Sequence, residues 1–243
     1  MPDSVYLNGF EAVQISPTAS TVDAVAAKIR NQIMRGQLRP GEKLVEGDLC
    51  QKFELSRPSL REVLRVLASE KLIELIQNRG PSVATLGQSD VEEIHDVWAL
   101  ITSAMVYEFV KMATNEDISI FNDALKDLDS ALAAKDPLGQ LNATNKVFRT
   151  ILSRFQNLVL TEIISSLVSR INFVRAQSLQ QEGWGALCAN EISDIIEAIV
   201  SRNAEGARYA TIRHIDSASA SAKLVIAAFD RSQKKQKSRK ATA

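Results

Sequence analysis

The stretch Ser56-Arg57-Pro58-Ser59-Leu60-Arg61 opens the helix that decides the fold of this chain. Ser56 is a strong amino-terminal cap, and Pro58 in the first turn lacks only an amide proton that the helix could not have used. The apolar residues that follow share one face at helical spacing: Leu60, Val63, Leu64 and Leu67. The basic residues recur every fourth position on another face: Arg57, Arg61 and Arg65. The sequence therefore predicts a helix that packs with one face and carries a row of guanidinium groups on the other.

Two shorter helices are predicted before this one, over residues 21–36 and 46–53, and the turn Arg39-Pro40-Gly41 separates them. After it, two β-prone runs, Leu72–Ile76 and Ser82–Leu86, flank a turn-forming centre. This pattern predicts a hairpin, or wing, that completes a winged helix-turn-helix over residues 21–86.

Three helices and a wing meet the physical needs of major-groove recognition. The start of the third helix must enter the groove, where Arg57 and Arg61 can pair bidentately with guanine and the small Ser59 permits close approach. Exposed amides beside Ser56 can meet phosphate. At the wing tip Arg79 can reach the sugar-phosphate backbone or the minor groove, and Gly80 supplies the turn. A single arginine on a helix is usually just solvated, but this combination favours contact with DNA.

The remainder of the chain reads as helical. Residues 1–20 show no sustained period and are expected to form a flexible arm, and residues 230–243 a basic disordered tail. Between them, helices are expected near 89–113, 116–134, 137–154, 157–179, 187–202 and 204–229. Six helices without strands predict an antiparallel bundle over residues 88–229. The expected fold class is mainly α, with an amino-terminal winged helix-turn-helix and a carboxy-terminal all-α bundle.

Charge and composition agree with this division. Residues 21–86 carry 11 basic and 8 acidic side chains, whereas residues 87–230 carry 12 and 19. Only the amino-terminal part is therefore expected to meet a polyanion. The sequence contains neither an apolar run of membrane length nor a secretory signal, so the cytoplasm is the expected location. Cys50 and Cys188 lack metal-ligand spacing and are expected to be small buried hydrophobes.

The amino-terminal part also resembles a known family. The resemblance is carried by Ile33, Gly36, Leu38-Arg39-Pro40-Gly41-Glu42-Lys43-Leu44, Leu49, Ser56-Arg57, Leu60-Arg61-Glu62, Leu64, Leu67, Asn78-Arg79-Gly80 and Val83. This set is similar to the winged-helix domain of the gluconate-repressor (GntR) family. The DNA contacts that the resemblance implies are Lys43, Arg57 and Arg61 to phosphates and bases and, at the wing, Asn78, Arg79 and Gly80. Pro58 and Ser59 stand where the family often has Thr-Pro, a departure that can alter base preference.

The helical half resembles, over about residues 88–228, the FCD effector domain of the FadR/FCD subgroup, which includes fatty-acid-responsive and many organic-acid-responsive members. The similar pieces are Asp90–Ile94, Asn145–Arg149, Glu191–Ile199 and Ala207–Ile215. Many members bind a divalent metal through one Asp and three His, and the matching residues here are Asn145, Arg149, Ile192 and His214. Only His214 can serve, because an amide oxygen is a poor ligand, guanidinium is cationic and isoleucine donates nothing. We therefore expect neither a metal nor another cofactor.

The same departures suggest how the effector site would work. Arg149 lies one helical turn from Asn145 and would place a permanent positive charge where the metal usually draws a carboxylate. It would then bind that carboxylate directly; the alternative is a decayed pocket in which Arg149 pairs with an acidic neighbour. Trp98 stands where the family pattern usually has arginine. The expected effector-binding residues are Asn145, Arg149, His214 and Trp98.

An enzyme is not indicated. His95 follows Glu92 at a spacing found in di-iron centres, but such a centre needs two motifs of this kind and further carboxylates. We therefore expect His95 at the surface or at an interface. The sequence shows no Ser-His-Asp set, Cys-His pair or glycine-rich phosphate loop.

The sequence thus predicts a homodimeric DNA-binding transcription regulator, a repressor in the leading interpretation, controlled by a small anionic organic acid in a metal-free pocket. Its expected partners are a double-stranded operator, the effector and a second copy of the chain, and no membrane. One alternative is a regulator with a degenerate pocket that is controlled by a partner protein or by abundance. The other is a helical binding or enzyme-like module with an incidental amino-terminal domain.

Overall fold

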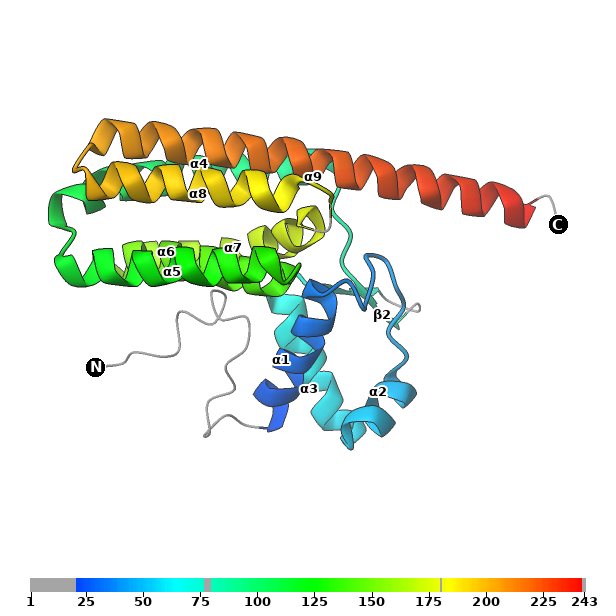
Figure 1. The fold of residues 1–243 in the computed structure, drawn as a ribbon. Helices are drawn as coiled ribbons and strands as arrows, with labels where there is room; N and C mark the ends of the chain where they lie inside the picture. The colour runs from blue at the N-terminus through cyan, green and yellow to red at the C-terminus, as the bar shows by residue number, and fades with distance from the viewer. Residues whose placement is uncertain (1–20, 77–79, 180, 242–243) are drawn as a thin grey trace.

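The computed structural model describes residues 21–76, 80–179 and 181–241. It has two parts, a winged helix and a larger helical bundle (Figure 1). The expected fold class, mainly α with a winged helix-turn-helix followed by an all-α bundle, is confirmed.

The winged helix contains α1 (Thr21–Met34), α2 (Glu46–Phe53), α3 (Arg57–Ser69), β1 (Ile73–Ile76) and β2 (Gly80–Val83). Its core contains the predicted apolar stripe of α3, Leu60, Val63, Leu64 and Leu67, which is buried against Val25, Ile29, Ile33, Leu49 and Leu72. A two-pronged contact between Arg30 and Glu70 ties α1 to the end of α3, with Arg30 Nε donating to Glu70 at 2.7 Å. These contacts fix α3 against the rest of the domain.

The wing is shifted relative to the prediction. β1 and β2 pair antiparallel, with Ile73 opposite Val83 and Ile76 opposite Gly80. The second strand is thus residues 80–83, where residues 82–86 were expected. The segment before α2 explains the shift, because the amides of Gly41 and Leu44 donate to the carbonyls of Val83 and Pro81 and hold β2 in this register.

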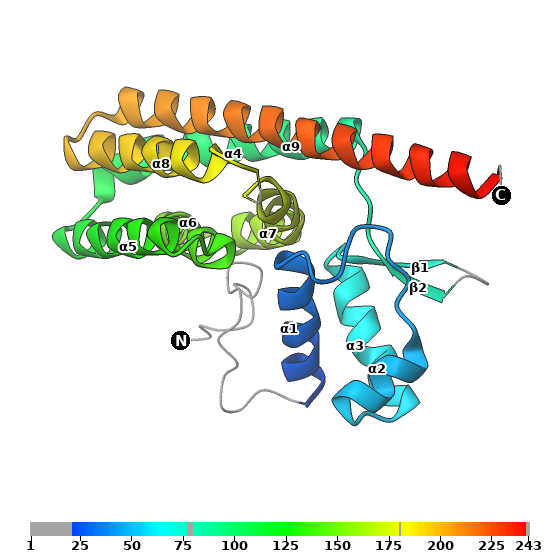
Figure 2. The same ribbon diagram turned by 45° about the vertical axis from the view of Figure 1, so that its right-hand side comes forward.

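The bundle contains α4 (Gln88–Met112), α5 (Asn115–Ala133), α6 (Pro137–Ser153), α7 (Leu158–Ser178), α8 (Trp184–Val200) and α9 (Ala204–Ala241). α9 runs between α4 and α8 along one side, and α5 and α6 lie side by side on the other (Figure 1). α7 crosses near the winged helix and is seen almost end-on above α1 in Figure 2. It is therefore the bundle helix closest to the DNA-binding part.

Two helix boundaries differ from expectation. α8 begins at Trp184, earlier than residue 187, directly after Gly183 in a left-handed conformation with φ 82°. The tail expected to be disordered from residue 230 is instead a continuation of α9 to Ala241. No glycine or proline follows Gly206 in α9, and alanine, lysine, arginine and glutamine are good helix formers, so nothing in the sequence ends the helix. Among the described residues, each helix is too short or too polar to cross a bilayer.

Candidate DNA-binding surface and effector cavity

The first turn of α3 is built as its sequence predicts. Ser56 has extended backbone angles, and its hydroxyl oxygen accepts a hydrogen bond from the amide of Ser59 at 3.3 Å. The two serine hydroxyls lie 2.9 Å apart. The cap fixes the direction in which the chain enters the helix, and therefore where the side chains of Arg57 and Arg61 begin.

The exposed arginines of α3 differ in their pairing. Arg65 donates to the carboxylate of Glu62 at 2.7 Å. By contrast, Arg57 and Arg61 are exposed and form no ion pair with any described residue. Two guanidinium groups at the start of the helix thus keep all their donors for a ligand, as bidentate recognition of guanine or phosphate requires.

Lys43 joins this surface from the base of the wing. It is exposed and bridges to Ser82 of β2, and its Cε would lie 3.9 Å from a Cβ placed on Gly80. Gly80 has φ 78°, a conformation that favours glycine. The aliphatic part of Lys43 therefore packs over the wing and its ammonium group remains in solvent. The predicted contacts Asn78 and Arg79 lie outside the described residues.

A second candidate site is a small cavity inside the bundle, with a volume of about 10 Å³. This is room for roughly one water molecule. Its lining comes from α4, α6, α7, α8 and α9 and comprises His95, Leu141, Thr144, Val174, Arg175, Ser178, Leu179, Trp184, Cys188, His214 and Ala218. The cavity is thus bounded by five helices of the expected effector domain.

Arg175 dominates the charge of this cavity. It is 7% exposed, forms no ion pair with a described residue, and its Nη1 has no hydrogen-bond partner. Its Cζ lies 5.6 Å from the ring centroid of Trp98 and 5.1 Å from that of Phe148. Burial lowers the pKa of Arg175 to about 10, so the side chain stays cationic at neutral pH. Because an unpaired buried charge is costly, this arginine is a strong candidate for binding an anion.

Two histidines lie beside Arg175. The pKa of His214 is lowered because it is buried, even though its Nδ1 lies 3.0 Å from a carboxylate oxygen of Glu191. Burial lowers the pKa of His95 to about 4, and its Nδ1 lies 2.7 Å from the carbonyl oxygen of Val91. The expectation that His95 lies at the surface or at an interface is wrong, since His95 is 3% exposed and lines the cavity. Its position on the inner face of α4, one turn from Val91 and Trp98, explains the burial.

The structure separates the residues predicted to bind the effector. His214 lines the cavity. Trp98 is buried but does not line the cavity, and its ring forms a T-shaped contact with Phe148 at 5.9 Å between centroids. Asn145 is buried, and neither its amide oxygen nor its amide nitrogen has a hydrogen-bond partner. Arg149 is half-buried and does not belong to the cavity lining. The positive charge in the cavity therefore comes from α7, where sequence reasoning had placed it on α6.

Arg175 and Glu191 were missed by sequence reasoning. The signal for Arg175 was available, because it is the one charged residue in the run from Ile171 to Ser178 of α7. A lone arginine within a buried, apolar and small-residue segment needs a compensating contact.

The donors at the positions of the family's metal site do not fit a divalent cation. Asn145, Arg149 and His214 include one imidazole and one guanidinium, and Ile192 is buried in the core. Within the described part of the chain, no group of three His, Cys, Asp or Glu side chains has a geometry that could hold a metal ion. Of the two free cysteines, Cys188 is buried and Cys50 is only partly so.

An interdomain groove of about 500 Å³ lies between the winged helix and the bundle. The wing side contributes Pro40, Gly41, Glu74, Ile76, Ser82, Val83, Thr85 and Leu86, and the bundle side contributes Phe173, Val174, Gln177, Ala222, Val225, Ile226 and Phe229. Val174 lines both the groove and the inner cavity. The two spaces therefore approach each other at Val174 of α7.

Comparison with known proteins gives two family matches. The model described as "Bacterial regulatory proteins, gntR family" matches residues 21–83, and the model of the FCD domain matches residues 93–217. An uncharacterized HTH-type transcriptional regulator, YdhC of Bacillus subtilis (strain 168), is 23% identical over 78% of this chain and 85% of its own. The galactonate operon transcriptional repressor of Escherichia coli (strain K12) is 25% identical over 62% of this chain and 75% of its own. A gluconate operon transcriptional repressor from Bacillus licheniformis is 36% identical over 41% of this chain and 40% of its own.

Solved structures share the fold. A transcriptional regulator GntR from Rhodococcus sp. RHA1 superimposes with a TM-score of 0.74 at 23% identity, covering 84% of this chain and 98% of its own. McbR/YncC of E. coli superimposes with a TM-score of 0.70 at 19% identity, covering 82% and 95%. The relatives are transcription regulators, which favours the regulator interpretation over the enzyme-like module.

Proposed function

Because this chain belongs to the gntR family of bacterial regulatory proteins and carries an FCD domain, we propose that it is a homodimeric repressor whose operator binding is controlled by a small anionic effector. That it is a DNA-binding transcription regulator and not an enzyme follows from the family itself. Its site of action in this proposal is the cytoplasm, where bacterial operator DNA lies.

The observation that carries DNA binding is the pair of unpaired guanidinium groups, Arg57 and Arg61, at the capped start of α3. In a winged helix-turn-helix this end of the recognition helix enters the major groove. Lys43 at the wing supplies a charge for the phosphate backbone.

Two observations support the dimeric repressor. One winged helix covers only a half-site, so operator recognition by this family architecture calls for two copies. α4 also presents exposed apolar residues at helical spacing, Val97 and Leu100, as a candidate contact for a second copy. The galactonate and gluconate relatives carry the word repressor in their names, and we extend that sign of regulation to this chain.

The effector half of the proposal rests on Arg175, a buried cation without an anionic partner among the described residues. The earlier candidate Arg149 remains a prediction, and it now competes with Arg175. The small cavity volume, about 10 Å³, favours a second candidate, a regulator whose pocket binds nothing and which responds to a partner protein or to its own abundance.

Gel shifts with fragments of the parent genome, at about 50 and 200 mM salt, test DNA binding. We expect a fragment that is retained at the higher salt and then released by one class of small organic acid. If no fragment is preferred over random DNA, the regulator proposal fails. If a fragment is preferred but no small molecule changes either its binding or the melting temperature of the protein, the pocket-free candidate replaces the effector-controlled one.

A further inference from the structure

The bundle cavity holds a buried cation that lacks a compensating charge. Arg175 is anchored between the faces of Trp98 and Phe148, and one of its terminal nitrogens has no partner. The aromatic faces hold the guanidinium in place, but a ring face cannot satisfy the donors of Nη1, which has no hydrogen-bond partner. Such an arrangement is preorganised for a planar anion and costs stability when empty.

We infer that the cavity is a direct binding site for a hydroxylated monocarboxylate, with the carboxylate on Arg175 and a hydroxyl donating to Nε2 of His214. The inference deepens the effector half of the proposed function and rests on it. It also replaces the family's metal by a protein cation, in agreement with the poor donor set at the metal positions.

The charged groups around the cavity favour a ligand with a single negative charge. Arg175 is the one lining residue that carries a permanent charge. His95 and His214 are neutral near pH 7, because burial lowers both of their pKa values. The carboxylate of Glu191 lies behind His214, where it would repel a second anionic group. A dicarboxylate would therefore bring one charge more than the site can neutralise.

The tautomers of the two histidines favour a ligand that carries a hydroxyl group. Since Nδ1 of His214 faces a carboxylate, it carries the proton and donates to Glu191. Nδ1 of His95 likewise donates to the carbonyl of Val91. In each neutral ring Nε2 is then an acceptor, and both Nε2 atoms are buried without a partner. A ligand that carries hydroxyl donors beside its carboxylate would satisfy these acceptors, whereas an alkyl carboxylate would leave them unpaired.

Phe148 connects the two contacts. Its ring centroid lies 5.1 Å from Cζ of Arg175 and 6.5 Å from the ring centroid of His214, which stacks on it. Arg175 and His214 both line the cavity, so one ligand in it would reach the guanidinium with one end and the imidazole with the other. The cavity must widen to admit it, because its volume of about 10 Å³ matches roughly one water molecule.

Matched pairs of acids test the ligand class on the full-length protein. The probes are glycolate, lactate and gluconate, each compared with acetate, propionate and hexanoate, which have the same carbon number without the hydroxyl groups. Lactamide removes the charge and malate adds a second carboxylate. We expect at least one hydroxy acid to raise the melting temperature more than its deoxy partner, and lactamide and malate to have little effect. The inference is overturned if no hydroxy acid raises it, or if the deoxy acids or malate do as well.

Variants of the two arginines test the position of the site. Arg175→Gln is expected to weaken binding of the active hydroxy acid by about tenfold or more, as for the loss of a charge-assisted hydrogen bond. The matched control Arg149→Gln should change it less than about twofold. Without ligand, Arg175→Gln should melt no lower than the wild type, because it removes an unpaired buried charge. The assignment is overturned if the hydroxy acid still binds Arg175→Gln with wild-type affinity. It is also overturned if binding is lost in Arg149→Gln, and this second result holds even if Arg175→Gln folds poorly.

Two further measurements complete the test. His214→Phe keeps an aromatic ring without the acceptor, so it should abolish the preference for lactate over propionate while leaving a carboxylate contact. Treatment with a chelator should leave the thermal shift unchanged; its loss would mean that a metal holds the ligand and would overturn the inference. DNA binding is assayed in parallel, so that failure of the ligand site with intact operator binding refutes this inference and leaves the DNA-binding function standing.

Discussion

At the residue scale, the arginines of this chain differ in whether they form an ion pair. Arg30 is committed to Glu70, and Arg65 to Glu62. Arg57 and Arg61 on α3 form no ion pair with a described residue, and Arg175 in the bundle forms none either. Arg57 and Arg61 are exposed to solvent, where DNA can approach, whereas Arg175 lines the bundle cavity. We therefore expect the two exposed arginines to contact DNA and the buried arginine to contact a small anion.

Substitution of the α3 arginines tests the DNA-binding surface. Arg57→Ala and Arg61→Ala should each weaken binding to a specific operator by about 1–3 kcal/mol, the usual value of a good base contact. Arg65→Ala is the matched control, because Arg65 lies on the same helix but is paired with Glu62. The affinity of this variant for the operator should stay close to that of the wild type. Titration by fluorescence anisotropy measures the difference. Wild-type affinity in both Arg57→Ala and Arg61→Ala would remove α3 from the interface.

Lys43 is expected to act differently, because an ammonium group on the wing contacts phosphate and reads no base. Lys43→Ala should weaken binding to specific and random DNA alike and lower the salt slope by about one unit. Affinities measured at four salt concentrations give the slope. A loss confined to the specific operator would instead make Lys43 a base-reading residue.

The two buried histidines should make stability depend on pH. Burial lowers the pKa of His95 to about 4 and also lowers that of His214, so the unfolded chain binds protons that the folded chain does not. Arg175 and Lys223 face His95 and act in the same direction. The contribution of the two histidines to the free energy of unfolding is therefore fully present above a pH of about 6.5. It falls as the pH drops toward 4, by up to about 1.4 kcal/mol per pH unit for each histidine.

Denaturant unfolding at pH 7.5 and 5.5 measures this loss. These are the chain's two histidines, so the double variant His95→Gln/His214→Gln should lose little stability over the same interval. An unchanged loss in that variant would assign it to carboxyl groups.

At the residue scale the sequence predicted the site only in part. His214 was identified from its position in the family pattern, and the structure places it in the cavity. Arg149 was placed on the pocket side of its helix from spacing alone, but α6 turns that position partly toward solvent. Arg175 comes from a different helix, and the packing of α7 against α4 and α6 that brings it to Trp98 and Phe148 is not visible in local periodicity.

At the scale of helices and strands, local chemistry predicted most of what is observed. The Ser56 cap, the stripe of α3 and the long helices of the bundle all follow from caps, spacing and the scarcity of glycine and proline. The deviations come from contacts distant in sequence or from a missing stop signal. The register of β2 is set by the segment around Gly41, and α9 continues to Ala241 because nothing interrupts it.

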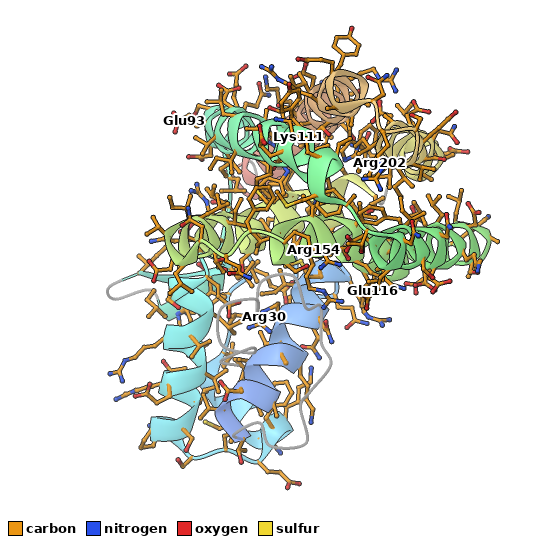
Figure 3. All side chains as sticks on the ribbon, turned by 90° about the vertical axis from the view of Figure 1, so that its left-hand side faces the viewer. Arg30, Glu93, Lys111, Glu116, Arg154 and Arg202 are labelled. Carbon is orange, nitrogen blue, oxygen red and sulfur yellow. The ribbon has the colours of Figure 1, made fainter. Side chains whose placement is uncertain are left out.

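The start of α5 offers a test at this scale. The Thr114 hydroxyl caps the helix at the amide of Asp117, and the Asp117 carboxylate accepts hydrogen bonds from the Thr114 amide and from Arg154. Figure 3 shows Arg154 close to Glu116, and their charged groups are 3.9 Å apart. Burial alone would raise the pKa of Asp117, but the Arg154 guanidinium and Thr114 outweigh it and lower the value.

Asp117→Asn should therefore destabilise the protein by about 1–3 kcal/mol. Because the folded pKa is lowered, the contribution is present above pH of about 3.9 and is lost as the pH falls below that value. Asp123→Asn is the matched control, since Asp123 is on the same helix in an exposed pair with Lys126 and should change stability by less than about 0.5 kcal/mol. Equal losses in the two variants, measured by denaturant unfolding at pH 7, would show that the buried cap has no special role.

At the scale of the whole molecule, α7 connects the proposed effector cavity to the DNA-binding part. Val174 lines both the cavity and the interdomain groove, and α7 also packs against α1. A ligand that widens the cavity displaces one or more of the five helices that line it, and two of these, α7 and α9, also line the interdomain groove. A displacement of α7 or α9 would change the groove that separates the bundle from the wing. An effector shifts this equilibrium only if it binds the two arrangements with different affinity.

Dimerisation is the prediction that depends on the whole molecule. On α4, Glu93 points away from the bundle in Figure 3, and the same outer side continues through Val97 and Leu100, which is 74% exposed. A second copy that covers this side would bury apolar surface that otherwise remains in water. We expect the full-length chain to sediment as a dimer at micromolar concentration and Leu100→Asp to sediment as a monomer. Leu158→Asp, at an equally exposed leucine of α7 (69%), is the matched control and should remain dimeric.

The monomeric Leu100→Asp variant should also bind a two-fold operator far more weakly than the wild-type dimer does. Two linked heads convert the second contact into an intramolecular step, so their separation removes a factor of about 10²–10⁴ in avidity without changing any contact to a base. The affinity for an isolated half-site, measured by fluorescence anisotropy, should by contrast be unchanged, because Leu100 is far along the chain from α3 and contributes nothing to its packing. A wild-type chain that sediments as a monomer, or a Leu158→Asp variant that dissociates as Leu100→Asp does, would place the contact between copies elsewhere than on α4.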